Sequence, residues 1–186
     1  MEHKGEGADR LTEVIEKMVH NLSLELNNIA IRQLEEGDIE RLRVWRNNPD
    51  NSKYLRKIKY ITEEMQRKWY ENYLKNDDEM AFAIVENQCI HEVVGSVSLY
   101  NFCDKRAEFG KILIGNEKAH GKKIGYTATR AVLQIAFEVL GLDEVVLECN
   151  NDNLAAIRVY EQAGFVLSEI AHANRYYKIT RQQFIK

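Results

Sequence analysis

The sequence contains very little proline, few cysteines and no long apolar run. Its 186 residues include one Pro and three Cys, and the cysteines show no C-x-x-C spacing. A disulfide framework and a zinc site are therefore not expected, and no metal is predicted. No stretch approaches the roughly 20 apolar residues that cross a bilayer. Residues 1–10 lack the apolar core of a signal peptide, so we expect a cytoplasmic protein without membrane contact.

An excess of positive charge is also absent. Lys and Arg number 26 and Asp and Glu number 29, which gives a net charge of -3 at pH 7. This balance gives no support to nucleic acid as a partner. What the chain does contain, 45% hydrophobic and 30% charged residues, is typical of a globular protein. Its length favours one domain with a substantial core.

The N-terminal part carries an apolar stripe at helical spacing among charged residues. Its members are Leu11, Ile15, Met18, Leu22 and Leu26. This spacing predicts an amphipathic helix over residues 11–26. We therefore expect an N-terminal extension over residues 1–28 and the main domain over residues 29–186. The helix could dock on the domain, pair with a second copy to give a homodimer, or be partly disordered.

The remaining pattern predicts strands first, and then helices and strands in alternation. Strands are expected over residues 29–34, 80–86, 93–100, 106–114 and 145–148, with two more near the C-terminus. Helices are expected over residues 38–46, 62–73, 125–140 and 153–163, the first two with Asp38 and Thr62 as N-caps. This order predicts an α+β domain with a mixed, mostly antiparallel central sheet flanked by helices.

The segment over residues 153–165 has the clearest local pattern. Asn153 can cap a helix, and Gly164 suits the left-handed position after its end. Tyr160 lies on the apolar face, where leucine would satisfy a helix that only needs packing. The tyrosine instead places a weak acid near the end of the preceding strand. Core packing is the alternative for this side chain.

A second segment, residues 108–125, leads from a strand through a loop with glycines and lysines to a helix N-terminus. Free backbone N–H groups and the helix dipole favour a phosphate at such a terminus. Gly121 and Gly125 let the backbone come close, and the neighbouring lysines add positive charge. Taken alone, this pattern is more often a solvated turn.

Together, the two segments resemble the GNAT superfamily of acetyl-CoA-dependent N-acetyltransferases. The family's loop pattern is Arg or Gln, two residues, Gly, one residue, and Gly or Ala. It maps onto residues 120–125, with His120 in place of Arg or Gln and Lys123 in place of the first Gly. The later segment is similar to the family's Asn-x-x-Ala-x-x-x-Tyr-Glu-Lys-x-Gly-Phe, with Gln162 for Lys. The resemblance covers about residues 29–178 and implies a single-domain GNAT fold.

The resemblance also implies acetyl-CoA as co-substrate and roles for individual residues. The strand after Glu108 would pair with the pantetheine arm and polarise the thioester carbonyl, and the loop would hold the pyrophosphate. Asn153 would contact the pantetheine arm, and Tyr160 would protonate the departing thiolate, a step for which a phenol is suited. The cofactor-binding residues implied in this way are Ile112, Leu113, Ile114, His120, Gly121, Lys122, Lys123, Ile124, Gly125, Tyr126, Asn153 and Ala156.

A carboxylate is expected to take the proton of the incoming amine. Glu108, at the start of the central strand, resembles in position the base of many relatives. Glu148, at the end of the neighbouring strand, is the second candidate. A solvated carboxylate at a strand end is the alternative for Glu108.

The acceptor, a small-molecule amine, is expected near the first two helices. Trp45, Arg46 and the later Trp69 resemble the ribosomal-protein-acetyltransferase-like branch, which includes enzymes that acetylate nucleotide-linked amino sugars. Aromatic faces suit a sugar or a base, and Arg46 could meet a diphosphate or a carboxylate. Core packing of both tryptophans stays open. So do polyamine acetylation, protein N-terminal acetylation and a catalytically silent CoA-binding module.

Overall fold

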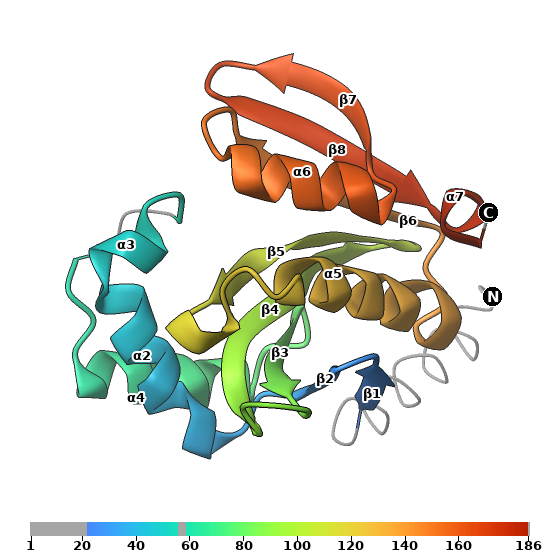
Figure 1. The fold of residues 1–186 in the computed structure, drawn as a ribbon. Coiled ribbons are helices and arrows are strands. Elements are labelled where there is room, and N and C mark those ends of the chain that lie inside the picture. The colour runs from blue at the N-terminus through green and yellow to red at the C-terminus, as the bar shows by residue number, and fades with distance from the viewer. Residues whose placement is uncertain (1–21, 56–58, 186) are drawn as a thin grey trace, which may run out of the picture.

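The computed structural model describes residues 22–55 and 59–185. These residues form one eight-stranded sheet in the order β1-β2-β3-β4-β5-β6-β8-β7. Of its neighbouring pairs, only β5 and β6 are parallel (Figure 1). The predicted mixed, mostly antiparallel sheet is therefore confirmed. Its strands are β1 (Ser23–Leu26), β2 (Ile29–Gln33), β3 (Glu79–Glu86), β4 (Glu92–Cys103), β5 (Arg106–Ile114), β6 (Glu144–Asn150), β7 (Val166–Ala171) and β8 (Asn174–Thr180).

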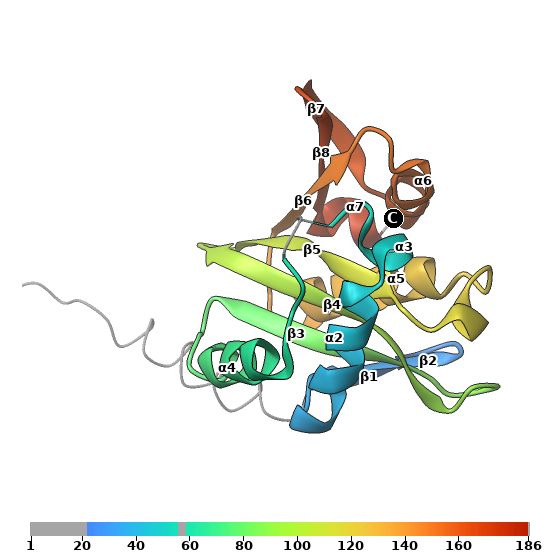
Figure 2. The ribbon, with the colours of Figure 1, turned by 90° about the vertical axis from the view of Figure 1, so that its left-hand side faces the viewer.

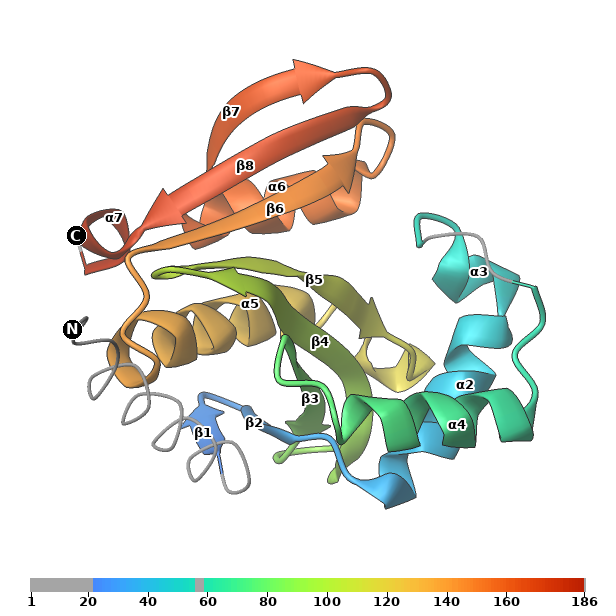
Figure 3. The same cartoon turned by 180° about the vertical axis from the view of Figure 1, so that it is seen from behind.

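Helices lie on both faces of the sheet (Figure 2). One face carries α5 (Ile124–Gln134), which continues into a π-helical turn η3 (Ile135–Val139), and α6 (Leu154–Ala163). The other carries α2 (Ile39–Asn47) and α4 (Glu63–Tyr73), as the view from behind shows (Figure 3). The short elements are η1 (Glu36–Asp38), α3 (Pro49–Ser52), η2 (Glu117–Ala119) and α7 (Arg181–Ile185). No helix in the described part of the chain is long and apolar enough to cross a membrane.

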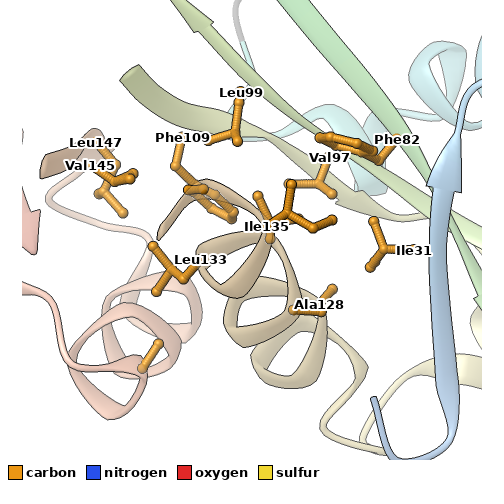
Figure 4. Packing of buried hydrophobic residues seen from close by; sticks show 14 of the residues in the cluster. Ile31, Phe82, Val97, Leu99, Phe109, Ala128, Leu133, Ile135, Val145 and Leu147 are labelled. Carbon is orange, nitrogen blue, oxygen red and sulfur yellow. The ribbon is translucent and has the colours of Figure 1, made fainter. Parts of the chain in front are cut away.

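Two hydrophobic clusters hold these helices against the sheet. In the larger one, Leu99 and Phe109 of the strands face Leu133 of α5 and Ile135 of η3, and all four are at most 1% exposed (Figure 4). Burying one such side chain contributes about 1.5–3 kcal/mol. The smaller cluster lies on the opposite face, under α2 and α4. Its buried members are Leu34, Ile39, Leu42, Tyr73, Ala81, Ala83 and Val93.

The helix starts predicted at Thr62 and Asn153 are confirmed. Thr62 Oγ1 accepts a hydrogen bond from the backbone N–H of Met65 at 3.2 Å. Asn153 Oδ1 accepts one from the backbone N–H of Ala156, also at 3.2 Å. Gly164 has φ +104°, the left-handed conformation expected just after a helix end. Both ends of α6 are therefore fixed by local sequence.

The predicted N-terminal helix is wrong over residues 23–26, which form β1 antiparallel to β2. Leu24 and Leu26 pack against the core, while Ser23 and Glu25 are exposed. Buried and exposed side chains therefore alternate with the period of two that is typical of a strand. The same leucines also fit the wider spacing of a helix, which is why the sequence pattern predicted one. The resulting hairpin crosses the predicted domain boundary between residues 28 and 29. Residues 11–21 of the predicted helix lie outside the described residues.

Asp38 does not cap α2 as predicted. Its carboxylate accepts a hydrogen bond from the backbone N–H of Glu35 at 2.9 Å and pairs with Arg32 at 2.7 Å. These contacts close the turn η1, from which α2 continues without a side-chain cap. The helix predicted over residues 125–140 is α-helical only to Gln134, after which η3 has the wider π-helical winding.

The hairpin between β3 and β4 is built around a buried carboxylate. Glu86 is 1% exposed, and its oxygens accept hydrogen bonds from the backbone N–H groups of Gln88, Cys89 and Ile90 at 3.2, 2.9 and 2.5 Å. Burial alone would raise the pKa of Glu86, but these N–H groups favour the charged form and lower the pKa to about 2. The charged carboxylate therefore stabilises the turn.

We expect Glu86→Gln to lower Tm by about 3–12 °C at pH 7. Hydrogen bonds to a charged acceptor contribute about 1.5–3 kcal/mol, and a domain of this size loses about 2–4 °C per kcal/mol. The folded-state pKa of Glu86 lies below its ordinary value of 4.5. The charged form therefore contributes fully above pH 4.5, and this contribution is lost as the pH falls towards 2.

The difference in Tm between wild type and variant should accordingly shrink over that pH interval. Thermal unfolding followed by circular dichroism measures it. Glu92→Gln is the control, because the side chain of Glu92 is 57% exposed on the adjoining strand. A difference in Tm that does not depend on pH would contradict the role of the charge.

Candidate active site

The two parallel strands at the middle of the sheet separate part-way along their length. β5 and β6 pair from Arg106 with Glu144 to Glu108 with Val146. Both strands then continue, to Ile114 and Asn150, without pairing with each other (Figure 3). We call this divergence the β5–β6 split. Because buried backbone groups need partners, the edges that face it can bind an extended ligand.

A β-bulge lies in β5 within this split. Ser98 pairs with Gly110 and Ser96 with Leu113, so Lys111 and Ile112 together lie opposite one residue of β4. Lys111 has φ +53°, as a bulge of this type requires. The extra residue reverses the alternation of β5. Ile112 and Ile114 consequently pack against the larger hydrophobic cluster.

Tyr160 lies on the α5 side of the split. Its ring packs edge-on against Phe109 of β5 and Phe165, with centroid separations of 5.9 and 6.0 Å. The side chain is 6% exposed, and burial, reinforced by the neighbouring Cys149 of β6, raises the pKa of the phenol. Tyr160 therefore stays protonated at neutral pH and can donate a proton to a group bound in the split. The predicted helix face of Tyr160 is confirmed, although core contacts hold its ring.

Glu108 lies on the opposite face, because neighbours along a strand point to opposite sides and Phe109 faces α5. Its Oε1 accepts a hydrogen bond from the Tyr100 hydroxyl at 2.7 Å, and its Oε2 accepts one from Asn101 Nδ2 at 2.9 Å. Burial and this bond to Glu108 raise the pKa of Tyr100. Glu108 is thus half-buried in a hydrogen-bonded setting and is not a freely solvated carboxylate.

Two further carboxylates share that face. Glu79 pairs in register with Tyr100, accepts a hydrogen bond from Ser98 Oγ at 2.9 Å and contacts Lys111 Nζ at 2.6 Å. Glu148 lies on β6, two residues beyond the partner of Glu108. It accepts hydrogen bonds from Asn174 Nδ2 and, at 3.3 Å, from the Tyr176 hydroxyl. These two phenols, Tyr100 and Tyr176, therefore each hold a carboxylate on the same face of the sheet.

The loop between β5 and α5 has the geometry of an anion site. Lys123 at the helix N-cap has φ +58° and provides no side-chain cap, and the Thr127 N–H is the first to bond back to it, at 3.0 Å. The N–H groups of Ile124, Gly125 and Tyr126 therefore have no acceptor within the helix. Gly121 has φ +75°, and space around Gly121 and Gly125 is open.

The residues of this loop join the end of β5 to the start of α5. His120, Lys122 and Lys123 are exposed. His120 Nε2 lies 2.9 Å from the carbonyl oxygen of Ile114, which joins the end of the loop to the end of β5. Lys123 replaces the first glycine of the GNAT pattern and still adopts the left-handed conformation that glycine favours.

Trp45 and Trp69 both pack against the smaller hydrophobic cluster. The Trp69 ring stacks on Tyr73 at 5.6 Å. The Trp45 indole lies so close to Gly115 that an added Cβ there would be 2.1 Å from it. Trp45 thus fixes α2 against the start of the loop between β5 and α5, and a contact of either tryptophan with an acceptor stays a prediction.

Arg46 is half-buried on α2 and lies near Glu79. Burial lowers the pKa of its guanidinium, and the Glu79 carboxylate acts in the opposite sense. No ion pair of Arg46 occurs among the described residues. A half-buried cation that forms no ion pair favours binding of an anion.

The sequence interpretation missed Tyr100, Asn101 and Lys111. Ser96, Ser98 and Tyr100 alternate with buried apolar residues along β4, a period-two pattern that marks a polar face. That pattern could have indicated Tyr100, although its contact with Glu108 depends on the register of two strands. Within residues 22–55 and 59–185, no group of His, Cys, Asp and Glu has the arrangement of a metal site.

The chain is similar to known acetyltransferases in sequence and in fold. A family model described as an acetyltransferase (GNAT) domain matches residues 28–166. Acetyltransferase PseH of Campylobacter jejuni is 25% identical over 163 residues, covering 88% of this chain and 97% of the relative. Spermidine N(1)-acetyltransferase of Vibrio cholerae is 27% identical over 142 residues, covering 75% and 80%. The structure of apo FdhC, described as a nucleotide-linked sugar GNAT, matches with a TM-score of 0.76 at 22% identity, covering 89% and 93%.

Proposed function

Because this chain belongs to the acetyltransferase (GNAT) family and is an acetyl-CoA-dependent N-acetyltransferase, we propose that it transfers the acetyl group directly to a primary amine at the β5–β6 split. One observation carries this proposal. The phenol of Tyr160 and the carboxylate of Glu108 lie beside the same split, on opposite faces of the sheet. Acetyl-CoA would enter on the Tyr160 side and the amine on the Glu108 side.

The chemistry follows from this placement. Glu108 takes a proton from the bound ammonium, and the amine nitrogen then forms a bond to the thioester carbonyl carbon. Backbone groups of Ile112, Leu113 and Ile114 would polarise the carbonyl oxygen. When the C–S bond breaks, Tyr160 gives its proton to the sulfur. The attacking nitrogen loses one of its two protons to solvent and keeps the other as the amide N–H. Solvent then returns a proton to the Tyr160 phenolate.

The loop residues fit a pyrophosphate. The unbonded N–H groups of residues 124–126 and the positive end of the α5 dipole would bind its oxygens, and Lys122 and Lys123 would balance their charge. Gly121 and Gly125 leave the approach open. Asn153 uses Oδ1 to cap α6, so it would meet the pantetheine arm through Nδ2. Ala156, whose N–H receives that cap, would lie beside it.

For the acceptor, we propose an amino sugar linked to a nucleotide. Arg46 supports this choice, because a half-buried guanidinium that forms no ion pair with a described carboxylate suits a diphosphate. Trp45, its neighbour on α2, could offer an aromatic face to the sugar or base. The FdhC structure, at 22% identity, shows the fold alone. The choice of acceptor therefore rests on Arg46.

A polyamine is the second candidate. Glu79, Glu108 and Glu148 all act on Tyr100, which places three carboxylates on the face where the amine would bind. A polycation would find complementary charge there. Lys111 already neutralises Glu79. The relative from Vibrio cholerae acts on spermidine by its name, which makes this alternative worth testing directly.

Acetyl-CoA turnover, measured as release of free thiol, tests both candidates. The acceptors are amino sugar nucleotides, spermidine, spermine and peptides with a free N-terminus. The proposal expects kcat/KM for one amino sugar nucleotide to exceed that for every polyamine by at least about tenfold, equivalent to about 1.4 kcal/mol. The reverse order would establish the polyamine. Turnover of none of these amines, with intact CoA binding, would remove the proposed function.

We expect Arg46→Met to raise KM for an amino sugar nucleotide by about 10- to 100-fold. Loss of one partner of a charge-assisted pair in a half-buried site costs about 1.5–3 kcal/mol. The KM for acetyl-CoA should stay within about twofold. Arg41→Met is the control, because Arg41 lies on the same helix and is exposed. Equal losses for nucleotide-linked and free amino sugars would show that Arg46 does not bind the anionic group.

A further inference from the structure

The Tyr100 hydroxyl lies further along β5, towards the end where β5 and β6 have separated, than the position at which Tyr100 pairs with Glu108. Glu108 is directly opposite Tyr100 on the neighbouring strand. The phenol nevertheless leans along β5, so that a Cβ added at Gly110 would be 2.7 Å from the Tyr100 hydroxyl. Gly110 thus provides the space that this hydroxyl occupies. The hydroxyl lies over Gly110 and donates back to Glu108 at 2.7 Å.

This position matters because of where the two strands part. Glu108 is the last residue of β5 that pairs with β6, so it lies at the closed end of the split. Gly110 is two residues on, about 7 Å along the strand. The carbonyl-polarising residues proposed above begin at Ile112. An amine that attacks there is therefore closer to the Tyr100 hydroxyl, which lies over Gly110, than to the backbone of Glu108, two residues back along β5.

The surroundings hold Tyr100 in this place. Lys111 Nζ lies 4.5 Å from the centroid of the Tyr100 ring and contacts Glu79 at 2.6 Å. A cation over an aromatic face is attracted by the negative face of the ring. Asn101 holds the second oxygen of Glu108. The phenol and its carboxylate are therefore fixed from both strands of the β4–β5 pair.

We propose that Tyr100 is a catalytic proton relay between the acceptor amine and Glu108. The Tyr100 oxygen accepts a proton from the ammonium while its own proton passes to Glu108 Oε1. Tyr100 ends the step as a neutral phenol, Glu108 holds the proton and later releases it to solvent, and the amine is free to attack. This inference rests on the proposed function, and it assigns to that site a residue that no sequence motif indicated.

Tyr176 provides a matched control on the same face of the sheet. Its hydroxyl donates to Glu148 at 3.3 Å, as that of Tyr100 does to Glu108. Glu148 lies beyond the pairing end of β6, and Tyr176 is on β8, away from β5. Tyr176→Phe therefore removes an equivalent phenol–carboxylate hydrogen bond without touching the relay.

The test compares Tyr100→Phe with Tyr176→Phe in the full chain, with the best acceptor from the panel. Tyr100→Phe should lower kcat by about 100-fold, the lower end of the range for a proton-transfer group. Its KM for acetyl-CoA should change by less than about twofold. Tyr176→Phe should stay within about twofold in kcat. CoA binding, measured by thermal shift, confirms that both variants are folded.

Two readouts separate a relay from a residue that only orients Glu108. The wild-type rate in mixtures of H₂O and D₂O should depend on two transferred protons, and that of Tyr100→Phe on one. The rate of Tyr100→Phe should also keep rising with pH as the free amine itself loses its proton. A one-proton dependence in the wild type, or an unchanged kcat in Tyr100→Phe, would overturn the relay while leaving the acetyltransferase intact. A wild-type protein that acetylates no amine would overturn both proposals.

Discussion

Replacing Tyr160 with phenylalanine is expected to lower kcat by about 100- to 1,000-fold, the range for loss of a positioned general acid. The thiolate would then leave without a proton donor in the split. The ring contacts with Phe109 and Phe165 do not involve the hydroxyl, so they should remain. The dissociation constant for acetyl-CoA should accordingly stay within about twofold. Steady-state kinetics together with calorimetric titration of CoA measures both quantities.

The pH dependence sharpens this prediction. Burial raises the pKa of Tyr160, so the wild-type phenol is protonated throughout the range from pH 6 to 9. The ratio of wild-type to variant kcat should therefore be constant over that range. A ratio that falls towards pH 9 would mean that the relevant acid titrates there, which a buried phenol does not.

Two variants serve as controls for Tyr160→Phe. Tyr177→Phe removes another buried phenol of the same region, whose hydroxyl donates to Glu161 at 2.9 Å, and it should leave kcat within about threefold. Cys149→Ala removes the thiol beside Tyr160. Burial raises the pKa of this Cys149 thiol to about 11. If Cys149→Ala costs as much rate as Tyr160→Phe, the thiol and not the phenol protonates the leaving group.

The parts of this fold that the sequence predicted are those that depend on local chemistry. The start of α6 at Asn153 and its end at Gly164 follow from side-chain and backbone preferences within a few residues. The same holds for the backbone of the loop over residues 120–125. There, even Lys123 adopts the left-handed conformation because the chain must turn into α5. Such features need no knowledge of distant segments.

The features that the sequence did not predict depend on how distant segments meet. The bulge at Lys111 and the pairing of Tyr100 with Glu108 are set by the register of β4 on β5. The close contact of Trp45 with Gly115 joins α2 to the end of β5 across 70 residues of sequence. A short pattern such as residues 23–26 supports both a strand and a helix, and only pairing with β2 decides between them.

Replacing Glu108 with glutamine is expected to lower kcat/KM for the acceptor by about 100- to 1,000-fold at pH 7. The amide keeps the size of the side chain but cannot take a proton from the ammonium. In Glu108→Gln the residual rate should therefore follow only the fraction of free amine in solution.

Glu148→Gln is the decisive comparison, because Glu148 shares the face of Glu108 and is likewise held by a phenol and an amide. Glu148 acts on Tyr100 by its charge alone, whereas Glu108 accepts the hydrogen bond of the Tyr100 hydroxyl, so the loss of Glu148 should cost at most about threefold. Combining Glu108→Gln with Tyr100→Phe should lower the rate little further than Glu108→Gln alone, since a relay without its base carries no proton. If Glu148→Gln instead shows the large loss, the amine approaches from the β6 side and the base is Glu148.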